Sequence, residues 1–168
     1  KLSKLAILID KSDGASTKIK NVEDIYFLSP MQQGMLFHTL YASDSGVYFE
    51  QLSCTLDGNL NVSALKRAWQ QVVERHPILR TAFIWEGLDE VLQVVRQRVR
   101  LPWEQHDWRG LSPVKQQEQL EAFQQADRER GFDLSQAPLM RLALIQVGED
   151  AYQFIWSYHH LLLDGWSL

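Results

Sequence analysis

The residues best suited to chemistry lie together in the stretch SYHHLLLDGWSL, residues 157–168. Two adjacent imidazoles, His159 and His160, are followed after three leucines by Asp164 and Gly165. An imidazole can accept or donate a proton near neutral pH, and glycine allows a positive φ or the close approach of a ligand to the backbone. The stretch therefore suggests proton transfer or substrate positioning. On spacing alone, an ordinary strand and turn with packed, hydrogen-bonded histidines is favoured over catalysis.

The strand expected before this turn limits how many histidines can act. The segment AYQFIWSYHH, residues 151–160, is rich in aromatic residues and predicts a buried strand. Successive side chains of a strand point to opposite faces, so His159 and His160 cannot both face one pocket. We expect His160, nearer the strand end, to be functional and His159 to be structural. Adjacent strand residues cannot chelate one ion, and no Cys and His cluster has zinc spacing, so no metal site is expected.

Composition favours one compact domain. The 168 residues are 45% hydrophobic and 11% aromatic, enough for a packed core. The net charge is −4 and no basic run is interleaved with aromatic residues, so nucleic acid is not an expected partner. The segment LAILI is too short for a membrane span or a signal sequence. A single cysteine, Cys54, cannot form an internal disulfide and favours a reducing, cytoplasmic location.

The rest of the chain predicts an α+β fold. Ser29 and Ser112 each precede a proline, which is typical of a helix start, and Pro77 ends a run of apolar residues at helical spacing. Helices are therefore predicted at residues 29–40, 61–76 and 112–131. Strands are predicted at residues 47–56, 79–85, 90–96, 101–108, 138–147 and 151–160, the second and third joined as a hairpin. This order favours a mixed β-sheet with helices packed on one of its faces.

The amino end differs in composition from the rest. Residues 1–20 include the polar stretch DKSDGASTKIK and are expected to be a linker or the remnant of an upstream unit. The predicted helices and strands all follow it, so residues 21–168 form the predicted folded unit.

Three separate stretches resemble motifs of one enzyme family. HHLLLDG matches HHxxxDG, RHPILRTAF at residues 75–83 resembles RHxxLRTxF, and LSPMQQGMLF at residues 28–37 resembles an opening motif. These are motifs of the condensation domains of nonribosomal peptide synthetases, which are similar in fold to chloramphenicol acetyltransferase. Their order and separation also match, and the resemblance covers residues 21–168. It implies a two-lobed enzyme of which these residues are the amino-terminal lobe.

The resemblance implies a reaction and partners. A donor acyl or peptidyl thioester on the phosphopantetheine arm of an upstream carrier domain would be attacked by the α-amine of an aminoacyl group on a downstream carrier. The chain itself would bind no cofactor. His160 would act as a general base or position the amine, since an α-amine with a pKa of about 8 is partly unprotonated near neutrality. A carboxy-terminal lobe would complete the site, so we expect this lobe alone to be inactive.

The resemblance also assigns supporting roles. Asp164 would be structural, paired with an arginine and holding the loop that orients His160. Arg80, in RHPILRT, is the candidate partner, and a solvated strand arginine is the alternative. Gly165 would let the substrate or its pantetheine arm approach the backbone, and His159 would belong to the structure.

Departures from the family pattern leave the subclass open. Many members carry an arginine in the opening motif, as SxAQxR, where this sequence has Gly34. SPMQQGMLFH together with HHLLLDGWS resembles the subclass that accepts a D-configured donor and an L-configured acceptor. Epimerization domains share the fold and HHxxxDG, but their motif tends to read DGVSW. A catalytically silent carrier-binding domain and a free-standing acyltransferase are further alternatives.

Overall fold

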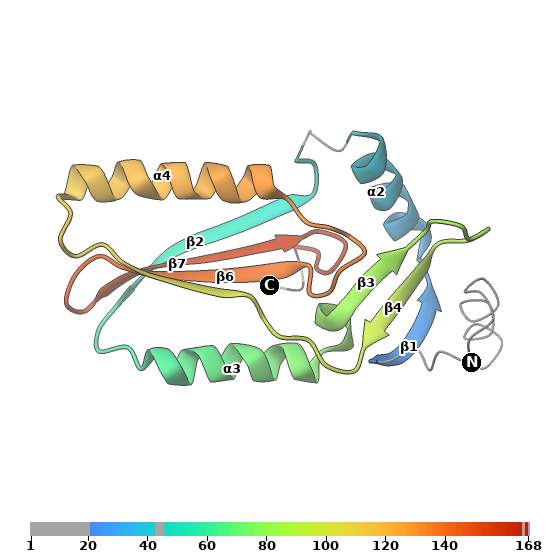
Figure 1. Ribbon diagram of the computed structural model, residues 1–168, viewed down its shortest axis with the longest axis horizontal. Helices are drawn as coiled ribbons and strands as arrows, with labels where there is room; N and C mark the ends of the chain where they lie inside the picture. Colours follow the sequence, from blue (N-terminus) through green and yellow to red (C-terminus); the bar gives the residue numbers. More distant parts are fainter. Residues whose placement is uncertain (1–20, 43–45, 166, 168) are drawn as a thin grey trace.

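The computed structural model describes residues 21–42, 46–165 and 167, which form two β-sheets flanked by helices (Figure 1). The larger sheet has the order β2-β7-β6-β5 and contains β2 (Phe49–Asp57), β5 (Trp103–Asp107), β6 (Met140–Gln146) and β7 (Ala151–His159). The smaller sheet has the order β1-β4-β3 and contains β1 (Val22–Phe27), β3 (Thr81–Ile84) and β4 (Leu92–Arg96). The helices are α2 (Pro30–Tyr41), α3 (Val62–Arg75), α4 (Pro113–Arg130) and the short 3-10 helix η2 (Pro77–Arg80). The predicted linker, residues 1–20, lies outside the described residues.

The larger sheet is mixed, as predicted. β5 runs parallel to β6, whereas β7 pairs antiparallel with both β6 and β2. The ladder between β2 and β7 ends at the pair Phe49 and His159. The turn that follows β7 therefore begins beside the first residue of β2.

Helices cover both faces of this sheet, which corrects the expectation of one covered face. Along β6, Leu142 and Leu144 join a core with α3, whereas Ala143 and Ile145 join a second core with α4. Figure 1 shows α3 and α4 on opposite sides of the sheet. The reason is visible in the sequence: the run LALI is apolar at every position, so both of its faces need cover.

The smaller sheet was only partly predicted. Its β3–β4 hairpin is confirmed, but the first strand begins at Thr81 because Pro77–Arg80 forms η2. The strand β1, which pairs antiparallel with β4, was not predicted. Its sequence VEDIYF carries two adjacent acids, and Ile25 is its one buried residue. A strand with so little buried apolar surface gives a weak sequence signal.

The predicted helix starts are confirmed. The Ser29 hydroxyl accepts a hydrogen bond from the Gln32 N–H at 3.2 Å, and the Gln32 side-chain oxygen accepts from the Ser29 N–H at 3.0 Å. This reciprocal arrangement is a capping box. Ser112 caps α4 through its hydroxyl, which accepts from the Lys115 N–H.

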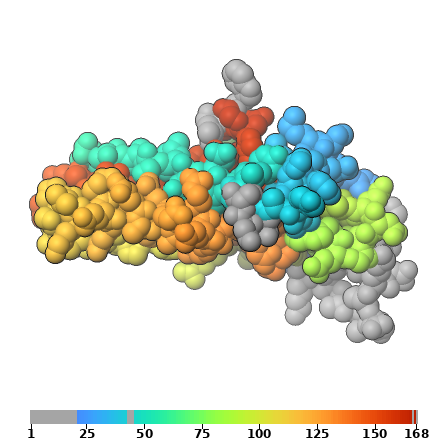
Figure 2. Space-filling model, turned by 90° about the horizontal axis from the view of Figure 1, so that it is seen from above, coloured from blue at the N-terminus to red at the C-terminus, as the bar shows by residue number. Residues whose placement is uncertain are grey.

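In Figure 2, α2 (blue to cyan) lies beside the smaller sheet and α4 (yellow) extends toward the other end of the molecule.

Candidate active site at the end of β7

His160 directly follows β7 and is partly exposed. Its backbone N–H donates to the Tyr48 carbonyl at 2.8 Å. Its Nδ1 lies 2.6 Å from the carbonyl oxygen of Leu163. A carbonyl oxygen can only accept, so Nδ1 carries the proton and the neutral ring keeps its lone pair on Nε2. No other residue in the described part of the chain hydrogen-bonds to Nε2, so the ring offers one proton acceptor.

His159 lies in the interior, where it is 3% exposed. Its Nδ1 accepts from the Leu161 N–H at 3.1 Å, and its Nε2 lies 3.4 Å from the Thr39 hydroxyl oxygen. That hydroxyl donates its hydrogen to the Met35 carbonyl at 2.8 Å, so the His159 Nε2–H must donate to it. Burial, and to a lesser extent the charge of His160, lowers the pKa of His159 to about 4. The ring is therefore neutral at neutral pH.

The three leucines of HHLLLDG hold the turn in place. Leu161 and Leu162 are 3% and 5% exposed, and Leu163 packs partly buried against the same core. The Leu162 N–H closes the turn by donating to the His159 carbonyl at 3.0 Å. Because the leucines are anchored in the core, the Leu163 carbonyl is fixed within reach of His160. Burial of the three leucines thus fixes the hydrogen bond between His160 Nδ1 and the Leu163 carbonyl.

Asp164 and Gly165 lie exposed beyond this turn. The Ser167 hydroxyl donates to Asp164 Oδ1 at 2.6 Å, and the Ser167 N–H donates to the Asp164 carbonyl at 3.0 Å. Gly165 does not adopt a positive φ, and in the part of the chain that the structure describes no heavy atom beyond its immediate neighbours lies within 4 Å of the position that a Cβ would take. Of the two possibilities that the sequence left open for this glycine, the positive φ is not adopted, and the backbone stays open to the close approach of another group.

The predicted ion pair between Asp164 and Arg80 does not form. Arg80, 4% exposed, instead pairs with Glu23 of β1 at 2.6 Å and donates to the backbone carbonyl of Arg96. Its guanidinium thus joins β1 to the end of β4. The sequence could not reveal this partner because Glu23 lies in the strand that was not predicted. Arg80 is therefore buried, and among the described residues no hydrogen bond or ion pair joins it to the HHLLLDG turn.

A buried polar cluster on the α4 side of the larger sheet was also not predicted from the sequence. Asp127 of α4, 5% exposed, accepts hydrogen bonds from Gln51 of β2, Ser157 of β7 and Arg141 of β6. Burial alone would raise the pKa of Asp127, but the hydrogen bonds from Ser157 and Arg141 outweigh it and lower the pKa. The partners lie far apart in the chain, so no local pattern marks them. The cluster fastens α4 to three strands.

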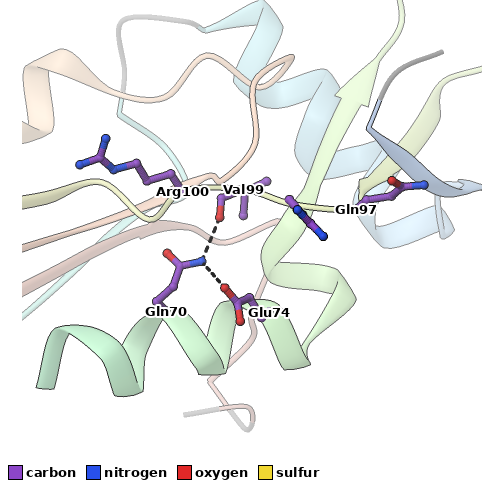
Figure 3. Close-up of a pocket in the computed structure, with 6 residues that line it drawn as sticks. Gln70, Glu74, Gln97, Val99 and Arg100 are labelled. Carbon is purple, nitrogen blue, oxygen red and sulfur yellow. Dashed lines mark hydrogen bonds between the residues drawn. The ribbon is translucent and has the colours of Figure 1, made fainter. Parts of the chain in front are cut away.

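Surface hollows lie on two sides of the fold. One of about 700 Å³ lies between α3 and the β4–β5 connection, where Gln70 donates to the Val99 carbonyl and to Glu74, both at 3.0 Å (Figure 3). None of the predicted site residues lines it. Another of about 540 Å³ opens between α2, the start of β2 and the end of α4, and reaches Thr39 and His159.

The described part of the chain holds neither a metal-binding cluster nor a membrane-spanning helix. Residues 21–42, 46–165 and 167 contain no group of three or more His, Cys, Asp or Glu side chains arranged to hold a metal ion. Among those residues, no helix has the length and apolar character needed to cross a bilayer.

Comparison with known proteins identifies the family. The family model described as the condensation domain matches residues 22–168. The chain belongs to the condensation domain family. It is 52% identical over 160 residues, 95% of the chain, to a linear gramicidin synthase of Brevibacillus parabrevis. It is 39% identical over 163 residues, 96% of the chain, to bacitracin synthase 3 of Bacillus licheniformis. The matched region is 3% of the length of each of these synthases.

Solved condensation domains share the fold. The starter condensation domain of rhizomide synthetase matches 86% of this chain with a TM-score of 0.75 and 24% identity, and the match covers 36% of that chain. A four-domain nonribosomal peptide synthetase bound to AMP and glycine matches 92% of this chain with a TM-score of 0.75 and 20% identity, covering 11% of its own length. The chain therefore spans only part of the condensation domains that it resembles, and its fold is that of one lobe of the chloramphenicol acetyltransferase-like architecture.

Proposed function

We propose that this chain contributes one lobe of a condensation domain that joins two carrier-bound groups through an amide bond. The donor is an acyl or peptidyl thioester on the phosphopantetheine arm of an upstream carrier domain. The acceptor is an aminoacyl thioester on a downstream carrier. The observation that carries the proposal is the His160 imidazole, whose Nδ1–H is engaged by Leu163 and whose Nε2 is left as an acceptor. The family match supports the same reaction.

The reaction needs one proton acceptor beside the attacking amine. The amine nitrogen attacks the thioester carbonyl carbon, a C–N bond forms, and the C–S bond breaks to release the donor arm as a thiolate. The amine loses one proton in this step, and Nε2 of His160 accepts a hydrogen bond from the N–H and then the proton. The thiolate takes up a proton, so the balance is thioester plus amine to amide plus thiol. Fixing the amine's direction of attack contributes as much as proton removal.

Other residues support the site without touching the reacting atoms. His159 holds the end of β7 in the core, and Asp164 holds the segment after the turn through Ser167. Gly165 leaves the backbone open to a pantetheine arm. Arg80 stabilises the smaller sheet through Glu23. The remainder of the domain supplies the opposite wall, so this lobe alone is inactive, and we place the synthetase in the cytosol.

The donor subclass is a finer part of the proposal. Gly34 lies on an exposed face of α2, and among the described residues no heavy atom outside its neighbours in this helix lies within 4 Å of its Cβ position. The cation that many family members place there is absent, which together with the HHLLLDGWS stretch favours a D-configured donor and an L-configured acceptor. Matched donors of both configurations on the upstream carrier test this. We expect at least ~10-fold faster condensation of the D donor. Equal rates would contradict the subclass.

The test of function is peptide-bond formation in a protein that contains the complete domain, with both carriers loaded. His160→Gln should lower the single-turnover rate at least ~100-fold, because general base catalysis and positioning are both lost. His38→Gln, at an exposed histidine on α2 that the proposal leaves unused, should stay close to wild type. A wild-type rate for His160→Gln would end the proposed role. Donor racemisation without amide formation would indicate an epimerization domain.

A further inference from the structure

Tyr48 occupies a backbone position that tyrosine rarely takes. The Phe49 N–H donates to the Gly46 carbonyl at 3.1 Å, which closes a turn over residues 46–49, and Tyr48 at its third position has a φ of +68°. Glycine or asparagine is normally preferred there, because a side chain with a Cβ is strained at positive φ. A bulky aromatic residue at such a site indicates that its side chain or its carbonyl has a specific role.

The Tyr48 ring lies against both histidines. Its centroid is 6.2 Å from that of His160, with the ring planes 30° apart, and 6.3 Å from that of His159, with the planes 51° apart. Both distances lie in the range of favourable aromatic pairs. One ring thus lies against both the buried imidazole of His159 and the partly exposed imidazole of His160.

The Tyr48 backbone reaches the same residue. Its carbonyl accepts the His160 N–H at 2.8 Å, one step beyond the last ladder pair of β2 and β7. His160 is therefore fixed at its backbone by Tyr48, at Nδ1 by Leu163, and along its ring by the Tyr48 side chain. Rotation of the ring out of the turn would break the hydrogen bond between Nδ1 and Leu163, and the neighbouring Tyr48 ring adds a second barrier to that rotation.

We propose that Tyr48 is a positioning residue that holds the His160 imidazole in the orientation in which Nδ1 donates to Leu163 and Nε2 faces the substrates. This inference rests on the proposed function for its catalytic consequence. Its structural content, one fixed ring orientation, stands apart from activity. The aromatic ring, and not the phenol hydroxyl, does the positioning.

Kinetics of Tyr48 variants in the complete domain give the first test. Tyr48→Gly suits the backbone but removes the ring, and we expect kcat to fall ~10-fold with the KM for the acceptor carrier within ~2-fold of wild type. Tyr48→Phe keeps the ring and should retain kcat within ~3-fold. Val47→Ala, at the exposed neighbouring turn position, is the matched control. Wild-type kcat in Tyr48→Gly, or an equal loss in Tyr48→Phe, would overturn the proposal.

Nitrogen-15 NMR of histidine-labelled domain gives a second readout that needs no turnover. The His160 signals, assigned through His160→Gln, should show the single Nδ1–H tautomer in wild type and Tyr48→Phe. In Tyr48→Gly they should move toward an average of both tautomers. Unchanged His160 signals in Tyr48→Gly would refute the positioning role. If His160→Gln keeps its activity but these shifts occur as expected, the proposed function fails while the role of Tyr48 survives.

Discussion

The two sides of the end of β7 treat the same residue type in opposite ways. On the interior side, His159 uses both ring nitrogens, accepting at Nδ1 from Leu161 and donating from Nε2 to Thr39. On the surface side, His160 donates from Nδ1 to Leu163 and leaves Nε2 as an acceptor. In their neutral forms the two rings are therefore opposite tautomers. The difference shows that the turn's backbone groups, and not the residue type, decide which imidazole keeps a nitrogen available as an acceptor.

The same short turn sets both states. Its amide at Leu161 points toward His159, and its carbonyl at Leu163 points toward His160. Both groups are fixed because the leucines are packed in the core. A turn whose side chains are buried thus converts a pair of adjacent histidines into one structural residue and one candidate acceptor.

The largest stability effect is expected at the interior ring. His159→Ala leaves the Leu161 N–H without its acceptor and opens a cavity beside Thr39, so the free energy of unfolding should fall by about 4 kcal/mol. Urea unfolding of the complete domain measures this. Thr39→Val, which removes the acceptor for the His159 Nε2–H and the donor to the Met35 carbonyl, should cost about 1 kcal/mol. A loss below about 1 kcal/mol for His159→Ala would show that the interior side is not a structural anchor.

Acid should destabilise the protein through the same residue. The pKa of His159 is lowered from 6.5 to about 4 in the folded state, so its contribution is fully present above pH 6.5. Below that pH His159 is protonated in the unfolded chain but stays neutral in the folded chain. The free energy of unfolding therefore falls by about 3 kcal/mol as the pH falls toward 4. Unfolding free energies measured across this range test it. His159→Gln should flatten that part of the profile, and a profile unchanged by the substitution would contradict the assignment.

A smaller effect is expected at Arg80, away from both histidines. Arg80→Met removes the buried guanidinium from Glu23 and from the Arg96 carbonyl, and should lower stability by about 2 kcal/mol. Glu23→Gln should cost less, because the Glu23 side chain is 45% exposed. Thermal unfolding compares the two variants. Equal and negligible effects would show that the contact between β1 and β4 does not depend on this pair.

The smallest stability effect is expected at Asp164. Its side chain is exposed and receives the Ser167 hydroxyl, so Asp164→Ala should change the free energy of unfolding by less than about 1 kcal/mol. The buried pair that the motif suggested would have made this loss several times larger. A loss of about 3 kcal/mol in urea unfolding would indicate that this carboxylate has a buried partner, and would contradict the account.

Local patterns predicted the parts of the fold that depend on local physics. Ser29 and Ser112 marked helix starts because capping needs only neighbouring residues, and the apolar run in β6 marked a buried strand. The pairing of Arg80 with Glu23 and the Asp127 cluster joins residues far apart in the chain, so no periodicity signals them. The histidine pair could be predicted in part. Strand alternation separated the two residues, but the tautomers depend on the path of the turn.

The most direct test of the account is the protonation of the His160 ring. Nitrogen-15 NMR of histidine-labelled complete domain, in mildly alkaline buffer, distinguishes the two neutral tautomers. The structure predicts a hydrogen on Nδ1 of His160 and on Nε2 of His159. A hydrogen on Nε2 of His160 would leave the proposed active site without its acceptor and would contradict the account.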